Sequence, residues 1–289
     1  LSTWGITQVL GGVRSKMIKD LRVLAYHRIL ADLDEPNYPF DLELVSATRP
    51  EFAWQMSYVE RRFCPVSCQQ VLDAIRGGAP LPKRAIMITF DDGFDDNHEI
   101  AFPILLKFGI PAVFFLTTRY IDTAHVFWFE QLVHALLRTP IKTLRLDTLQ
   151  VTIEPGETPV SRRAAAASLL NQLKRTPQEL RLLALAELDH VSGVEVSASD
   201  RRWSTAMTWD QVRSMAKAGM EIGSHSVSHP VLSAITNPTE LSHELEASKA
   251  TIEHEVGRPV TALAYPVGGR NAISPEVLTA TRHAAYDLA

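Results

Sequence analysis

Strand-like and helix-like segments alternate along most of this 289-residue chain, and that alternation restricts its fold more than any other feature. Short apolar runs with the length and composition of buried strands lie at residues 21–26, 85–90, 112–117, 220–222 and 260–265. Helix signals separate several of them: a segment at residues 99–108, a capping box at residues 208–211 with a stop at Gly219, an Asn-Pro start at Asn237 that runs to Gly257, and a Ser-Pro start at Ser274. Because parallel strands need a crossover between them, the sequence predicts an α/β fold with a parallel sheet or a (β/α) barrel.

Residues 123–205 interrupt this alternation. They contain an aromatic helix signal near residues 127–137, a hairpin signal at residues 144–153 and Ala-rich helical sequence at residues 162–188. We therefore expect a mostly helical insertion at residues 123–205 within a single domain spanning residues 1–289.

Composition and charge argue against several classes of protein. With 29 Lys+Arg against 33 Asp+Glu, the net charge of -4 gives no electrostatic reason to expect nucleic acid as a partner. The most apolar stretch, residues 110–118, is about half as long as a membrane span. Cys64 and Cys68 are too few for a cysteine-based zinc site and are expected to be ordinary thiols. Residues 1–20 lack the ordered regions of a signal peptide, and the sequence leaves the compartment (cell envelope or cytoplasm) and the oligomeric state open.

Two adjacent carboxylates follow the strand predicted at residues 85–90. Asp91 and Asp92 are followed by Gly93, which turns the chain. In a (β/α) barrel the carboxyl ends of the strands form the catalytic face, so this pair is a candidate for catalysis. Taken alone, Asp-Asp-Gly is more typical of a simple turn.

A pair of histidines follows another predicted strand, at residues 220–222. His225 and His229 are spaced so that both imidazoles can reach one ion, and Pro230 favours a tight loop over a continued helix. Such a pair is common by chance. Two histidines with one carboxylate, however, form the open coordination sphere of a catalytic divalent metal site. We therefore predict a metal site in which one aspartate is a ligand and its neighbour is free to act as a base.

These two segments together resemble the first two motifs of the polysaccharide deacetylases of carbohydrate esterase family 4. The motifs are Thr-Phe-Asp-Asp-Gly at residues 89–93 and His-Ser-x-x-His at residues 225–229. The resemblance extends across residues 21–30 and 81–122, and resumes from Met207 to the end of the chain. It implies a distorted (β/α) barrel with fewer than eight regular strands.

The resemblance also implies roles for the site residues. Asp92, His225 and His229 would bind a divalent metal, zinc in the first place, with cobalt or nickel as alternatives. Asp91 would be the general base.

The stretch that corresponds to the third motif departs from the family pattern. Residues 264–269 read Ala-Tyr-Pro-Val-Gly-Gly, in which Pro266 matches and Val267 would offer its backbone N–H to the oxyanion. The arginine expected before this proline, which would orient the base, is absent. Arg270 is the nearest substitute.

The family's final motif, Leu-x-His, does not occur before the chain ends at Ala289. Biofilm-type, circularly permuted members carry it in the first strand, and this chain has Leu-Ala-Tyr-His at residues 24–27 there. The resemblance makes His27 the acid that protonates the departing amine. A histidine suits that role because its ordinary pKa lies near 6.5. The alternative interpretation is a buried structural histidine.

The sequence thus predicts a metal-dependent hydrolase that removes N-acetyl groups from an acetylated polysaccharide or oligosaccharide. A serine nucleophile is disfavoured because no Gly-x-Ser-x-Gly motif is present. Two alternatives stay open: an O-acetyl polysaccharide esterase that uses the same residues, and a catalytically inactive carbohydrate-binding barrel.

The remaining polar and aromatic residues are expected to be structural. Asp95, Asp96 and His98 would begin the next helix, where acids suit the helix dipole. The Phe-Trp-Phe sequence at residues 127–129 would pack in the core, and residues 244–255 would form a solvated helix face. Histidines without a partner at metal-binding spacing are expected at the surface or in packing: His125, His134, His190, His243, His254 and His283.

Overall fold

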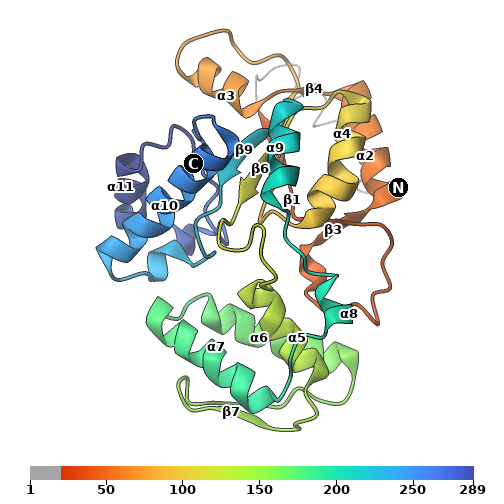
Figure 1. Ribbon diagram of the computed structural model, residues 1–289, viewed down its shortest axis with the longest axis vertical. Coiled ribbons are helices and arrows are strands. Elements are labelled where there is room, and N and C mark those ends of the chain that lie inside the picture. The colour runs from red at the N-terminus through yellow and green to blue at the C-terminus, as the bar shows by residue number, and fades with distance from the viewer. Residues whose placement is uncertain (1–20) are drawn as a thin grey trace, which may run out of the picture.

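A parallel sheet forms the centre of the computed structural model, which describes residues 21–289 (Figure 1). Its strands lie in the order β1-β5-β6-β9, and a short β4 pairs with β5. The bounds are Arg22–Tyr26 for β1, Cys64–Pro65 for β4, Ala85–Phe90 for β5, Ala112–Leu116 for β6 and Glu221–Ser224 for β9. Every ladder in this sheet is parallel, so the carboxyl ends of the strands meet at one edge. The predicted α/β class is confirmed.

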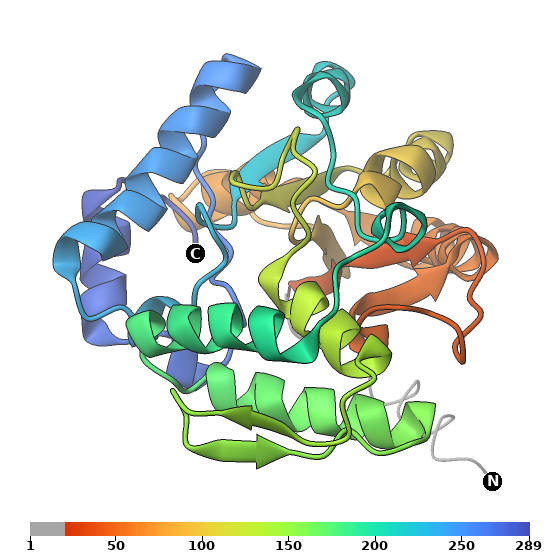
Figure 2. The ribbon, with the colours of Figure 1, turned by 60° about the horizontal axis from the view of Figure 1, so that its bottom comes forward.

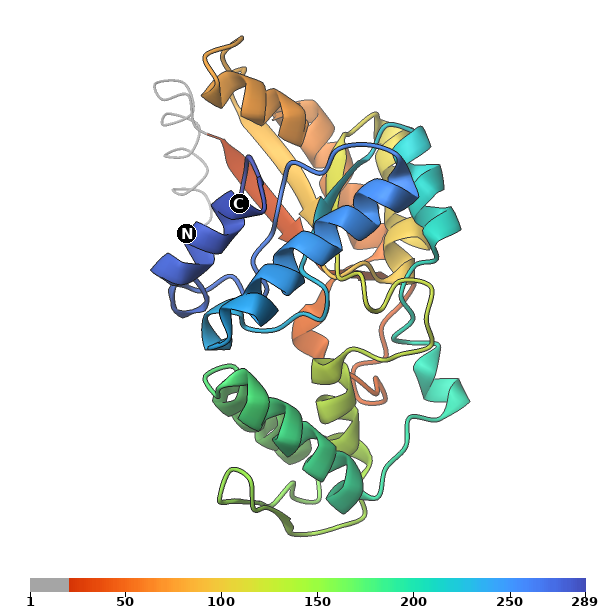
Figure 3. The same ribbon diagram turned by 60° about the vertical axis from the view of Figure 1, so that its left-hand side comes forward.

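Helices flank the strands on both sides. In Figure 1, α2, α4 and α9 lie together on one side and α10 and α11 on the other, and Figure 3 shows α10 running alongside the sheet. The helices of this part are α2 (Arg49–Arg62), α3 (Cys68–Ile75), α4 (Phe102–Phe108), α9 (Trp209–Lys217), α10 (Pro238–Val256) and α11 (Pro275–His283), with short turns η1 (Leu42–Leu44), η2 (Asn97–Ala101), η3 (Leu232–Ala234) and η4 (Arg270–Ala272). Three predicted starts are confirmed, because Thr208, Asn237 and Ser274 each accept a backbone N–H of the first turn.

The strand predicted at residues 260–265 is wrong as a regular element. This segment makes only isolated parallel bridges, between Ser224 and Leu263 and between Ala262 and Leu288. The ladder cannot continue past Ser224 because β9 ends there, and on the other side of this bridge Glu221 and Ile222 of β9 line a cavity together with residues 259–262 instead of pairing with them. Regular parallel ladders thus join β1, β5, β6 and β9, and beyond β9 only single bridges continue the sheet. This irregular end is the distortion expected of the barrel.

The chain between β6 and α9 forms a mostly helical body at the lower end of Figure 1. It consists of α5 (Trp128–Arg138), α6 (Pro159–Leu173), α7 (Gln178–Ser192), α8 (Ala198–Arg201) and an antiparallel hairpin of β7 (Leu144–Leu146) and β8 (Val151–Ile153). Figure 2 shows the hairpin at the lower edge of this body, where β7 packs against α7. Buried leucines of these helices, such as Leu136 and Leu170, belong to the same apolar cluster as Phe90 and Phe114 of the sheet. Body and sheet therefore share one hydrophobic core.

A second small sheet pairs β2 (Arg28–Leu30) in parallel with β3 (Val45–Thr48). Cys64 and Cys68 are free thiols, as expected. Within residues 21–289, no helix combines the length and the apolar character needed to cross a bilayer. The expectation about a signal peptide concerns residues 1–20, which lie outside the described residues.

Candidate metal centre and active site

Asp91 and Asp92 lie in a tight turn at the carboxyl end of β5. Asp92 and Gly93 both have left-handed backbones, with φ of 74° and 93°. A Cβ on residue 93 would lie 2.9 Å from the Ile121 side chain, so the close packing and the backbone conformation both favour glycine. The turn places the neighbouring carboxyl groups in different surroundings: the Asp92 side chain is 1% exposed, that of Asp91 18%.

His225 and His229 lie on the loop that follows β9. The His225 N–H donates to the Leu116 carbonyl at 2.8 Å, at the end of β6. Ser226 and His229 have left-handed backbones, with φ of 67° and 57°. The segment is therefore a tight loop rather than a helical turn, which agrees with the effect expected of Pro230.

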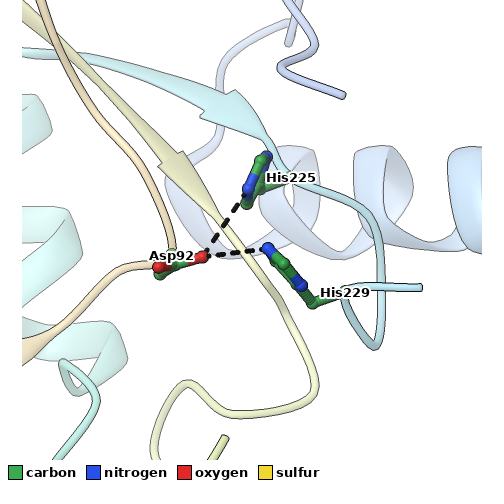
Figure 4. Close-up of side chains that lie close together, drawn as sticks. All are labelled: Asp92, His225 and His229. Atoms are coloured by element: carbon green, nitrogen blue, oxygen red, sulfur yellow. Dashed lines mark ion pairs between the residues drawn. The ribbon is translucent and has the colours of Figure 1, made fainter. Parts of the chain in front are cut away.

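Both imidazoles point at the Asp92 carboxylate (Figure 4). The His229 Nε2 lies 3.3 Å and the His225 Nε2 3.6 Å from the Asp92 Oδ1. One ligand atom from each of the three residues falls within 4.8 Å of the others, and all three residues are buried. Among the described residues, neither Asp92 oxygen has a hydrogen-bond partner.

This donor set fits a divalent metal ion. The His225 Nδ1 lies 2.8 Å from the Ala264 carbonyl, which places the proton on Nδ1 and leaves Nε2 with a free lone pair. Burial lowers the pKa of His225 and lowers that of His229 well below its ordinary value, so both rings are neutral, the form that binds metal.

Burial also raises the pKa of both carboxyl groups. The pKa of Asp92 rises to about 7, against the opposing effect of His225. The pKa of Asp91 rises to about 6, against the opposing effect of His27. A cation between Asp92 and the histidines would favour the ionised carboxylate, because opposite charges stabilise each other most where water is excluded.

His27 lies opposite Asp91, just beyond the end of β1. Its Nε2 is 4.0 Å from the Asp91 Oδ2, and its side chain is 35% exposed. The backbone is held on both sides: the His27 N–H donates to the Ser46 hydroxyl at 2.9 Å, and Asn97 donates to the His27 carbonyl at 2.7 Å. The alternative of a buried structural histidine does not describe this ring.

Val267 has a left-handed backbone, with φ of 70°. This conformation is a genuine outlier for a β-branched residue and marks a segment under strain. Val267 lines the same cavity as the residues described above, whereas Arg270 is not among the residues that line it. Arg270 therefore does not take the place of the arginine that the family pattern would put beside Asp91.

One cavity of about 280 Å³ joins all six predicted site residues: His27, Asp91, Asp92, His225, His229 and Val267. Its other wall comes from the helical body and η1, and includes Trp128, Phe129 and Lys174. Trp128 is buried in packing, as expected, but it also faces the cavity and donates its indole N–H to the His229 carbonyl at 3.0 Å.

The sequence profile of the family described as polysaccharide deacetylase matches residues 78–288. The chain belongs to the polysaccharide deacetylase family. It is similar to the poly-beta-1,6-N-acetyl-D-glucosamine N-deacetylase of Escherichia coli (strain K12), at 44% identity over 78 residues, which cover 27% of this chain and 11% of that protein. The match therefore spans only about a tenth of that relative's length.

Two solved structures have a similar fold. IcaB from Ammonifex degensii superimposes with a TM-score of 0.58 at 18% identity, covering 93% of this chain and 82% of that one. The Streptococcus pyogenes deacetylase PplD in complex with acetate superimposes with a TM-score of 0.57 at 18% identity, covering 93% and 81%. The predicted fold, a distorted (β/α) barrel of the polysaccharide deacetylase type, is confirmed.

This polysaccharide deacetylase buries an ionic network that the sequence analysis missed. The Arg28 guanidinium pairs with Asp96 at 2.9 Å and lies 3.6 Å from the carboxylate of Glu130 on α5. Asp96 begins a helical segment, as expected, but its side chain is also buried and adjoins Asn97, which holds the His27 backbone. The network thus ties α5 to the strand ends. The one sequence signal for this network is a second acidic pair, Asp95 and Asp96, three residues after Asp91 and Asp92.

The expectation of a solvated face at residues 244–255 is wrong at two polar positions, Glu244 and Ser248, which are both buried. Glu244 is 5% exposed, and its carboxylate accepts the backbone N–H groups of Val227 and Ser228, each at 2.9 Å. These amides lie between the two histidines of the candidate site. No sequence signal pairs Glu244 with them, because its neighbours on α10 include ordinary exposed residues.

Proposed function

We propose that this polysaccharide deacetylase is a metal-dependent hydrolase that removes N-acetyl groups from an N-acetylated polysaccharide and releases acetate. The observation that carries the proposal is the buried Asp92 carboxylate, which lacks a hydrogen-bond partner among the described residues and faces two neutral imidazoles. A buried carboxylate in this state is costly unless a cation compensates it. The N-deacetylase names of the E. coli relative and of a Staphylococcus epidermidis relative support an N-acetylhexosamine polymer as the substrate class.

Asp92, His225 and His229 would hold the ion. One carboxylate oxygen and two imidazole nitrogens suit zinc, with cobalt or nickel as alternatives, and leave open positions for substrate and water. When bound, such an ion supplies a Lewis acid that polarises the acetamide carbonyl and lowers the pKa of water.

The chain's own residues would carry the protons. Asp91, which is partly accessible from the cavity, would accept the proton of the attacking water. The N–H of Val267 would donate to the oxyanion that forms on the acetamide oxygen. His27 would protonate the leaving amine from the other side, since an amine expelled as an anion is a very poor leaving group.

The exchange of His27 for alanine tests its role as the acid. An acid acts only while protonated, so in the wild type we expect activity to fall at alkaline pH. The His27→Ala variant should keep its fold and its ion, show lower activity and lack this alkaline limb. A pH–rate profile of kcat/KM measures this, with the exposed histidine of α11, His283→Ala, as the matched control. A variant that keeps the alkaline limb would remove His27 from the mechanism.

Substrate class is tested by acetate release from N-acetylglucosamine oligomers and from acetylated xylan, each with and without a chelator. We expect release from the N-acetylated oligomers that stops on chelation and returns when zinc is added. Preferential release from xylan would instead identify an O-acetyl esterase. Glycan binding without any acetate release would identify an inactive carbohydrate-binding barrel.

A further inference from the structure

The loop that carries both histidines cannot hold its shape unaided. Ser226 and His229 have positive φ, a conformation that costs non-glycine residues free energy. His225, Ser226 and His229 are buried and the two residues between them, Val227 and Ser228, are partly buried, so the backbone N–H groups of the loop need partners within the protein. Within the loop itself, the Ser226 hydroxyl accepts the His229 N–H at 3.1 Å. The amides of Val227 and Ser228 are left to find partners elsewhere.

Glu244 of α10 supplies those partners. Its Oε2 accepts the N–H groups of Val227 and Ser228, both at 2.9 Å, and its Oε1 accepts the Ser228 hydroxyl at 2.6 Å. One carboxylate therefore satisfies three donors in the stretch that separates His225 from His229.

A second residue of α10 supports the start of the same loop. The hydroxyls of Ser248 and Ser224 lie 2.7 Å apart, and the Ser224 hydroxyl accepts the N–H of Ser226 at 3.2 Å. Glu244 and Ser248 are one helical turn apart and face the same side. Two side chains of α10, Glu244 and Ser248, therefore hold this loop through hydrogen bonds.

We propose that Glu244 is a positioning residue for the metal centre, and that its carboxylate orders the turn between His225 and His229 so that both Nε2 atoms face Asp92 before an ion binds. This inference rests on the proposed metal-dependent function. It assigns Glu244 no contact with substrate. The hydrogen-bond geometry, more than the negative charge, makes the contribution, because all three contacts go to the loop that carries the ligands.

Two substitutions separate geometry from charge. Glu244→Gln keeps the length of the side chain, since its amide oxygen can accept both backbone N–H groups and its NH₂ can donate to the Ser228 hydroxyl. Glu244→Asp keeps the charge but is one methylene too short to reach the loop. We expect Glu244→Asp to weaken zinc binding about 10- to 100-fold, and Glu244→Gln to stay within about threefold of wild type. Glu246→Gln, at an exposed position of the same helix, is the control.

Zinc affinity is measured by calorimetry on the full chain, and the absorption spectrum of the cobalt-loaded protein reports ligand geometry. Glu244→Asp should alter that spectrum, and Glu244→Gln should preserve it. If Glu244→Gln binds zinc weakly while Glu244→Asp binds it like wild type, charge rather than positioning is decisive and the proposal is overturned. It is also overturned if both variants bind like wild type.

A further variant keeps the proposal testable if Glu244→Asp does not fold. Ser228→Ala removes one of the three contacts at a partly buried position, and should weaken zinc binding about three- to tenfold. Unchanged affinity in Ser228→Ala would then contradict the positioning role. A wild-type chain that binds no zinc would instead contradict the proposed function itself, which separates the two failures.

Discussion

Asp91→Asn is expected to lower acetate release by about two to four orders of magnitude while the protein still binds its ion, because the substitution removes a base without removing a ligand. The two neighbouring aspartates allow this separation because the turn at Gly93 gives them different surroundings. Asp92 is buried against the histidines, and the Asp91 carboxylate faces the cavity beside His27. Activity is measured with N-acetylglucosamine oligomers, and bound zinc is measured on the same samples.

Asp92→Asn provides the comparison for Asp91→Asn. It should lose both the ion and activity, because an amide oxygen is a weaker ligand than a carboxylate and brings no charge to balance the cation. Glu43 is an exposed residue whose carboxyl group lines the same cavity, and Glu43→Gln should leave both the bound ion and the activity nearly unchanged. If Asp91→Asn loses the ion and Asp92→Asn keeps it, the two roles are reversed.

Local signals were sufficient to predict most of the regular elements. The helix from Pro238 to Val256 is one example: Asn237 caps it by accepting the Thr239 N–H, and Gly257 ends it with φ of 68°. Each of these signals depends on residues within one turn, so the sequence displays it directly. The apolar run at residues 260–265 looked equally clear, yet its pairing depends on where β9 stops, which is a property of another segment.

The same distinction applies to the cavity. His27, Asp91, Asp92, His225 and His229 each follow a strand, and parallel strands end at one edge, so their meeting in one cavity could be predicted. Their chemical roles remain proposals.

The residues that support this cavity could not be predicted in the same way. Arg28 and Glu130 approach each other only because the helical body packs on the strand ends. Glu244 contacts amides 16 and 17 positions earlier in the chain, a separation that carries no periodic signal. The partners of Arg28, Glu130 and Glu244 are set by tertiary packing. In the sequence, these charged residues therefore look like ordinary surface residues.

Exchanging both histidines for alanine is expected to abolish metal binding. The His225→Ala, His229→Ala variant leaves a single carboxylate, and its zinc affinity should fall by more than about a hundredfold, beyond the range usual for loss of a supporting residue. The zinc affinity of each single variant should fall by less than that of the double variant. Zinc content after dialysis measures the loss, with the exposed histidine of α10, His243→Ala, as the control.

Thermal unfolding gives an independent measure of the same loss. An ion that binds only the folded chain stabilises it by about 2.7 kcal/mol when present at about a hundred times its Kd. Added zinc should therefore raise the Tm of wild type and of His243→Ala, and leave that of the double variant unchanged. The double variant should also unfold at no higher temperature than ion-free wild type, because Asp92 stays buried without a hydrogen-bond partner among residues 21–289. One zinc ion per chain retained by the double variant would show that the ion binds elsewhere, and the assignment of Asp92, His225 and His229 would then be wrong.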